Sequence, residues 1–219
     1  EFISLAEKKN LSIVGFDIGF PIQLSNVITT KLYFDYAKII DFGDGAAAGI
    51  RFDFRGMGLI SASAKLERRF MSDRYFPSYF NAMYEVERFS VDTSAGTFKS
   101  KARNLNVTKS TAGVYGELGM NVLGMFDIVG SYQRLDDNPN SGILHIGTAI
   151  EPESLPFVLR AGYDKINIID EKDLFTLDDR SYLFVETGYK PYPFLLVSLV
   201  YQWTYTPVRD GGDSIVGYE

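Results

Sequence analysis

Cysteine is absent from this 219-residue sequence, and histidine occurs only once, as His145. Without cysteine the chain forms no disulfide and offers no thiolate to a metal. Long apolar runs are also missing, because no stretch approaches the roughly 20 consecutive apolar residues of a membrane-spanning helix. Basic residues do not predominate either. The net charge of −6 argues against nucleic acid as a partner.

The N-terminus has no basic region followed by an apolar core, so we expect no signal peptide and interpret the chain as a mature form or an excised piece. What the sequence does contain is dispersed apolar and aromatic residues, with 46% hydrophobic residues, 17 Phe and 14 Tyr. These residues alternate with polar ones in segments of about ten. The pattern is clearest where Ile50, Phe52 and Phe54 oppose Arg51, Asp53 and Arg55.

A helix would scatter these charges around its circumference, whereas a strand places them all on one face. The alternation therefore predicts strands with one apolar and one polar face. Ten such segments are clear or probable: 14–20, 31–36, 49–55, 60–69, 114–121, 126–133, 143–150, 157–164, 181–189 and 195–204.

The connections between these segments alternate in length. Short ones lie at 25–26, 56–58, 123–124, 151–153 and 190–193. Longer or more polar ones lie at 41–45, 73–110, 136–142 and 169–180. This alternation indicates an up-and-down meander, with short turns at one end and longer loops at the other.

Periodicity, loop alternation and the C-terminal Val216–Glu219 resemble outer-membrane β-barrel proteins over nearly the whole length. The resemblance implies an all-β fold, an antiparallel up-and-down transmembrane β-barrel with short periplasmic turns and long extracellular loops. It also implies the outer membrane of a diderm bacterium as the location, the lipid bilayer as a partner, and other envelope proteins as further candidate partners. No family motif accompanies the resemblance, so it assigns no functional residue.

The alternative is a soluble β-sandwich or lipocalin-like barrel with its apolar faces inward, since alternation alone does not decide which face points in. Two observations favour the membrane. Charges cluster on adjacent strands, where opposite signs form ladders. Aromatic residues gather near strand ends, as in an interfacial girdle: Tyr163, Tyr189, Tyr201, Trp203 and Tyr205.

The side of the membrane on which each end of the chain falls predicts about twelve strands, of which ten are clear, in one domain spanning residues 1–219. Ten strands would leave both termini on the long-loop side, whereas outer-membrane barrels normally keep them on the periplasmic side. We therefore expect one further strand at each end, at Phe2–Ala6 and Ser214–Glu219. The alternative is that the chain is part of a larger barrel.

If the polar faces point inward, they predict the pore-lining residues Lys31, Asp35, Arg51, Asp53, Arg55, Lys65, Glu67, Arg69, Glu117, Asp127, Arg160 and Asp164. In a narrow bore these side chains either line an aqueous pore and set its selectivity, or pair off and fill the lumen. The best candidates for contact with an anionic solute are Arg51, Arg55, Lys65 and Arg69. Asp53 and Glu67 lie among them and neutralise part of their charge.

Catalytic chemistry finds little support. Nothing near His145 in sequence completes a triad, so a hydrogen-bonded lumenal histidine is the preferred interpretation and we expect no enzyme activity. The Asp-rich turns do not match calcium-loop spacing, so we expect neither a metal nor another cofactor.

The connection at 73–110 is the most unusual segment, because loops of this length are usually functional or disordered. Its aromatic residues Tyr75, Phe76, Tyr79 and Phe80 are candidates for a contact or a constriction. The sequence therefore predicts a porin-like channel for ions or small polar solutes, with this loop as its gate. The alternative is a non-conducting anchor or assembly component that binds other envelope proteins.

Overall fold

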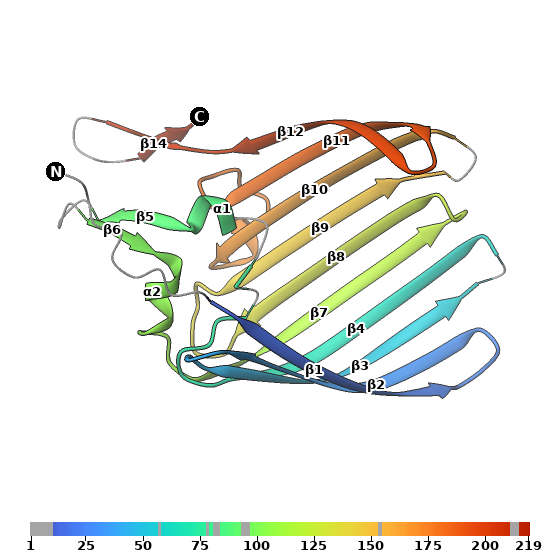
Figure 1. Ribbon diagram of the computed structural model, residues 1–219, viewed down its shortest axis with the longest axis horizontal. Helices are drawn as coiled ribbons and strands as arrows, with labels where there is room; N and C mark the ends of the chain where they lie inside the picture. The colour runs from blue at the N-terminus through green and yellow to red at the C-terminus, as the bar shows by residue number, and fades with distance from the viewer. Residues whose placement is uncertain are drawn as a thin grey trace.

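The computed structural model describes residues 11–56, 58–77, 79–80, 84–92, 97–152, 155–210 and 215–219. Ten strands form one antiparallel sheet, and neighbours in the sheet follow one another along the chain (Figure 1). They are β1 (Ile13–Gln23), β2 (Ile28–Ile39), β3 (Asp44–Arg55), β4 (Ile60–Met71), β7 (Thr111–Val122), β8 (Phe126–Leu135), β9 (Gly142–Ile150), β10 (Phe157–Ile168), β11 (Ser181–Tyr192) and β12 (Leu195–Thr204). The all-β, up-and-down antiparallel arrangement is confirmed.

The connections alternate as the sequence indicates. Turns of two to six residues lie at the right of Figure 1, and the connections 40–43, 72–110, 136–141 and 169–180 lie at the left. One boundary differs, because β11 continues through Tyr192 and leaves only two residues before β12. Strand pairing through Tyr192 and Leu195 accounts for the shorter turn.

The predicted last strand is wrong in its placement. β14 (Ile215–Tyr218) pairs with β13 (Pro207–Arg209) in a separate two-stranded sheet. Backbone bonds between Thr206 and Glu219 close this hairpin, so its ladder is completed without the large sheet. The predicted first strand, Phe2–Ala6, lies outside the described residues. The described part of the large sheet therefore has ten strands rather than twelve.

The long connection between β4 and β7 carries small elements at the left of Figure 1. These are α1 (Tyr84–Glu87), β5 (Phe89–Asp92), β6 (Thr97–Ser100) and α2 (Lys101–Leu105). A short 3-10 helix, η1 (Glu171–Asp173), lies between β10 and β11. Within the described ranges, no helix is long and apolar enough to cross a membrane.

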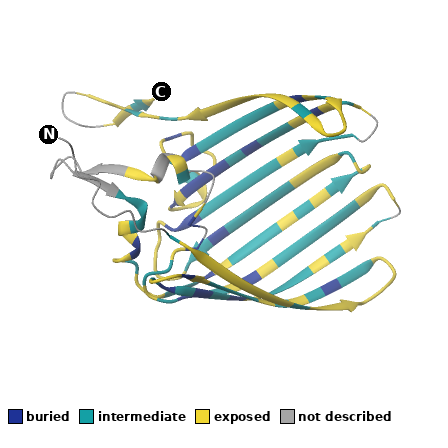
Figure 2. Ribbon diagram, viewed as in Figure 1, coloured by how far each residue is buried: buried dark blue, intermediate teal, exposed yellow. Residues whose placement is uncertain are grey.

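The large sheet is curved, and it curls at β1 and β12 (Figure 1). Among the described residues no ladder joins these two edge strands, so the sheet is open between them. Figure 2 shows both edges largely exposed. The side chains of each strand alternate between a concave face, which lines two cavities, and a convex face.

The convex face is apolar and uncovered. Phe16, Leu118 and Leu199 lie on it, with 59%, 68% and 63% of their surface exposed. The only hydrophobic core cluster in the described part is small and sits at the long-connection end, where Ile39 packs with Tyr79 and Leu105. Most of the apolar surface on the strands thus faces outward.

Candidate functional site: the charged concave face

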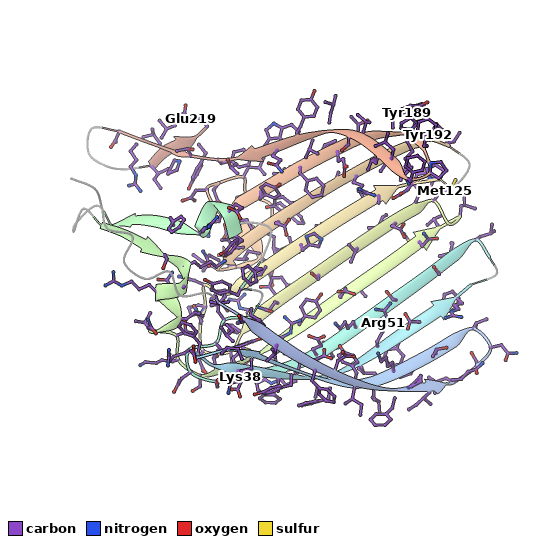
Figure 3. All side chains as sticks on the ribbon, in the orientation of Figure 1. Lys38, Arg51, Met125, Tyr189, Tyr192 and Glu219 are labelled. Atoms are coloured by element: carbon purple, nitrogen blue, oxygen red, sulfur yellow. The ribbon has the colours of Figure 1, made fainter. Side chains whose placement is uncertain are left out.

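The sheet register aligns the polar side chains of separate strands into rows across the concave face. One row crosses β2 to β10 and consists of Lys31, Arg51, Lys65, Glu117, Ser131, His145 and Asp164. Figure 3 labels Arg51 within this face. Of the twelve predicted pore-lining residues, ten line the two cavities, and Glu117 and Asp164 share the row above.

The larger cavity measures about 810 Å³ and lies toward the short-turn end. Its floor is formed partly by a second row, in which Gly119 and Gly147 contribute no side chain. Asp53 is the β3 member of this row, opposite Thr29 on β2 and Ser63 on β4. The missing side chains of Gly119 and Gly147 leave part of the floor low, whereas the Phe184 ring covers Gly162 farther along the row. The alternation pattern identifies the face but not this row, because the row depends on register.

The smaller cavity, about 250 Å³, lies toward the long-connection end. Among the residues that line it, Glu67 has an almost completely buried carboxylate, with 2% of its side chain exposed. Lys65 and Arg69 each approach it to 2.6 Å, and the Tyr33 hydroxyl donates a 2.8 Å hydrogen bond to it. The Arg69 guanidinium also lies 3.9 Å from the centre of the Tyr115 ring. These two cations are therefore bound within the wall.

Other charges on this face pair more loosely. Arg51 donates through Nε to Asp53 at 2.8 Å, and both side chains keep a third or more of their surface exposed. Arg160 binds Glu186 at 3.1 Å and Glu151 at 3.0 Å. Lys190 also contacts Glu151. Sequence reasoning omitted Glu151 and Lys190 because they fall in or beside a predicted turn.

His145 is hydrogen-bonded on the concave face. Its Nδ1 lies 2.8 Å from Asp164 Oδ1, on the neighbouring strand. Ser131 faces His145 from the other side, so the register brings Ser, His and Asp into consecutive positions. The His145 Nε2, however, lies 3.2 Å from where a Cβ of Gly147 would stand, along its own strand. No hydrogen bond in the described residues joins Ser131 to His145, so the row lacks the linkage a catalytic triad requires.

The aromatic residues of the long connection divide into two groups. Tyr75 lines the smaller cavity, and its ring stands over Gly45, where a Cβ would approach it to 2.4 Å. Tyr79 packs into the core cluster and is 5% exposed. Phe76 and Tyr79 lie near the Lys101 ammonium, while Phe80 remains exposed. One ring of the predicted set thus enters the concave mouth.

A buried ion cluster lies on the convex side of the sheet, and no pattern in the sequence indicates it. Lys165 is fully buried beneath the 169–180 connection and contacts Asp178 at 2.8 Å and the Thr176 carbonyl at 2.6 Å. Arg180 bridges Asp173 and Asp178. Burial is the largest single influence and opposes ionisation of both aspartates, but hydrogen bonds from Arg180 and from other groups, Thr176 for Asp173 and Lys165 for Asp178, together lower the pKa of each below its ordinary value.

The described residues contain no group of three or more His, Asp or Glu side chains that could hold a metal ion. The concave face thus carries many charged side chains around two cavities, and most of its carboxylates are paired with cations. Comparisons with protein-family models and with curated proteins find no match for the chain.

Proposed function

We propose that the sheet forms the wall of a transmembrane β-barrel in the outer membrane of a diderm bacterium, and that its bore passes ions or small polar solutes. The observation that carries the proposal is the direction of the two faces. In a soluble lipocalin-like barrel the apolar side chains fill the interior. Here the concave face is charged, and the convex face exposes large apolar side chains such as Phe20, Phe52 and Leu66.

Strand length supports the same interpretation. The strands of the large sheet are 9 to 12 residues long, close to the 9–11 residues that a tilted strand needs to cross a bilayer. At the short-turn end, Tyr192 stacks on Phe194 at 5.5 Å between ring centres, and Figure 3 shows Tyr189 and Tyr192 there. At the other end Trp203 stacks near Tyr201. Aromatic side chains at both ends suit the two lipid–water interfaces.

The apolar surface of the convex face ends at charged groups near the long-connection end of the sheet. Arg68 forms an ion pair with Asp136 there. Arg134 donates to the carbonyl oxygens of Pro139 and Ile169 at 3.1 and 2.8 Å. Both arginines stand near the long-connection ends of their strands, where a headgroup region would begin.

Barrel closure requires pairing of β1 with β12 or the insertion of further strands between them. Because β1 and β12 run in opposite directions, an antiparallel barrel closes only with no inserted strand or with an even number of them. A barrel of ten, of twelve or of a larger even number satisfies this condition.

Membrane insertion is tested by a matched pair of substitutions. Leu118→Arg adds a charge to the middle of the convex face, and Val129→Arg adds one to the concave face of the neighbouring strand. In detergent and in lipid vesicles, we expect heat-modifiable gel migration for the wild type. Leu118→Arg should cost about 2–4 kcal/mol of stability in the bilayer, and Val129→Arg much less. Full solubility of the wild type without detergent would refute the membrane assignment.

Conduction is tested with purified protein in planar bilayers. The expected result is a stepwise current that Val129→Arg reduces, because its side chain enters the larger cavity. Silence of the wild type and of a variant lacking residues 73–110, at all voltages, would reject the channel.

A second candidate is a non-conducting anchor or assembly component. The specific observation in its favour is the dense pairing near the long-connection end, where Glu67 binds Lys65 and Arg69 and Tyr75 stands in the mouth. A plugged bore would fold and insert normally but carry no current. The conduction experiment separates the two.

A further inference from the structure

Three cations converge on the larger cavity from β2 and β3. Lys31 and Arg51 are directly opposite each other across the two strands, and Lys65 is opposite Arg51 on β4. Arg55 follows on the same face of β3. Like charges in directly opposite positions destabilise a sheet. Their retention therefore calls for a compensating negative charge.

The carboxylates of the protein neutralise some of these cations more than others. Lys65 is held by Glu67, but Arg51 is bonded only through Nε to Asp53, which leaves its two terminal nitrogens without a hydrogen bond to the described residues. The side chains of Lys31 and Arg55 make no hydrogen bond or ion pair within the described ranges. Of these three cations, only Arg51 forms an ion pair among the described residues, and Asp35 attracts Lys31 electrostatically without a hydrogen bond.

The space beside these cations is open. The cavity that they line extends over Gly119 and Gly147, and its volume of about 810 Å³ is ample for an oxyanion with its remaining water. The stem of Lys31 lies across Gly19 of β1, where a Cβ would meet Lys31 Cε at 2.0 Å. An ammonium and two guanidinium groups are the kinds of donor that bind phosphate in proteins, and the Lys31 side chain is long and flexible enough to turn toward the cavity.

We propose that Lys31, Arg51 and Arg55 form a binding site for a phosphate-like oxyanion, either free or carried by a small solute, on the wall of the bore. The site rests on the proposed function in that it names the class of solute the channel would favour. It lies on the concave face, away from the apolar surface, so a dissolved anion is its ligand rather than a lipid headgroup. Asp53 limits its affinity by neutralising part of Arg51.

Binding is measured with the purified full chain in detergent, with inorganic phosphate as the probe and chloride at equal ionic strength as the reference. Phosphate should raise the thermal unfolding midpoint of the wild type. The variant K31Q/R51Q/R55Q should bind at least tenfold more weakly, because each guanidinium provides charge-assisted hydrogen bonds. D53N should bind more tightly. K38Q, which removes a cation outside the cavities, is the matched control and should behave as wild type.

Two outcomes overturn the site: phosphate stabilises the triple variant as well as the wild type, or K38Q weakens binding as much as the triple variant does. A competition experiment distinguishes a dissolved anion from a lipid headgroup. Phospholipid vesicles are added to the protein with phosphate bound, and the phosphate that remains bound is measured. If vesicles displace phosphate, the ligand is a headgroup and the assignment to a dissolved anion is wrong.

Bilayer recordings separate this proposal from the channel itself. In a salt gradient, the triple variant should shift the reversal potential toward cation selectivity, and phosphate should reduce chloride current in the wild type only. A protein that binds phosphate but never conducts would reject the channel and keep the site. A conducting protein whose selectivity ignores both the substitutions and phosphate would reject the site and keep the channel.

Discussion

Lys165→Met should release the 169–180 connection from the outside of the sheet. The Lys165 side chain is fully buried, and its partner Asp178 is 5% exposed. Removing one member of a buried ion pair typically costs about 3–5 kcal/mol, because the remaining charge is left desolvated. Arg180 still contacts Asp178, so we expect the lower end of this range.

The effect should be local, because the cluster joins one connection to the end of β10. Hydrogen exchange of the Ser181 and Asp173 amides, which donate to Asp178 and Asp170 carbonyls, is the appropriate assay. A cost of about 3 kcal/mol corresponds to more than a hundredfold faster exchange. Lys172→Met, in the same connection but exposed, is the matched control.

A double variant, K165M/D178N, removes both charges and should recover part of the lost protection. Two results would contradict a stabilising ion pair between Lys165 and Asp178. One is exchange in K165M no faster than in Lys172→Met. The other is a double variant whose loss equals the sum of the two single losses, since that would mean that the two side chains do not interact.

Three further predictions concern the concave face and the pH response. Glu67→Gln should lower the thermal midpoint strongly, by the equivalent of about 3 kcal/mol or more, whereas Asp53→Asn, at an exposed pair, should cost less than about 1 kcal/mol. Gly45→Leu should displace the Tyr75 ring and increase single-channel current, and an unchanged current would show that Tyr75 does not narrow the mouth. The pKa of Asp178 is lowered in the folded protein. Its contribution to the stability of the 169–180 connection should therefore be complete above the ordinary carboxyl pKa of about 4, and it should be lost as the pH falls through the lowered folded-state pKa. The protection factors of the 169–180 amides, which are exchange rates corrected for the intrinsic effect of pH, should therefore stay constant from pH 7 down to about pH 4 and then fall.

The sequence predicted the two faces of the strands wherever the alternation is regular, because alternation is a local property. Two-residue periodicity at Arg51, Asp53 and Arg55 is sufficient to place all three on one side of a strand. Connection lengths likewise predicted which strands are adjacent. Both inferences need only the order of residues along the chain and the pleat of a strand.

Alternation does not predict which side chains face each other across neighbouring strands, because these partners depend on register. The sequence grouped Arg51, Arg55, Lys65 and Arg69 as one basic cluster. In the structure Glu67 binds the two β4 residues, while Lys31, two strands from Lys65, faces Arg51. Shifting a single strand by one residue would exchange its faces, so register follows from all the strands together.

The connection at 169–180 was predicted, but its ion pairs with Lys165 were not, for a different reason. Lys165 interrupts the alternation of β10 and occupies a position that the pattern would assign to an apolar side chain. A bulge between Lys165 and Ile168, with Asn167 at a positive φ of 54°, changes the direction of the strand there. The connection then folds back over the lysine, and only tertiary structure reveals its partners.

Opposing charges across the concave face give the proposed channel a direction of selectivity. In the row from Lys31 to Asp164, the β2–β4 side carries three cations and the β7–β10 side carries Glu117 and Asp164. An anion in the larger cavity is therefore attracted mainly to the β2–β3 wall, because the opposite wall carries both Asp127 and Arg160. Since Glu67 already compensates Lys65, the attraction falls mainly on Arg51, Arg55 and Lys31. The same three residues would thus control both oxyanion binding and the charge selectivity of the bore.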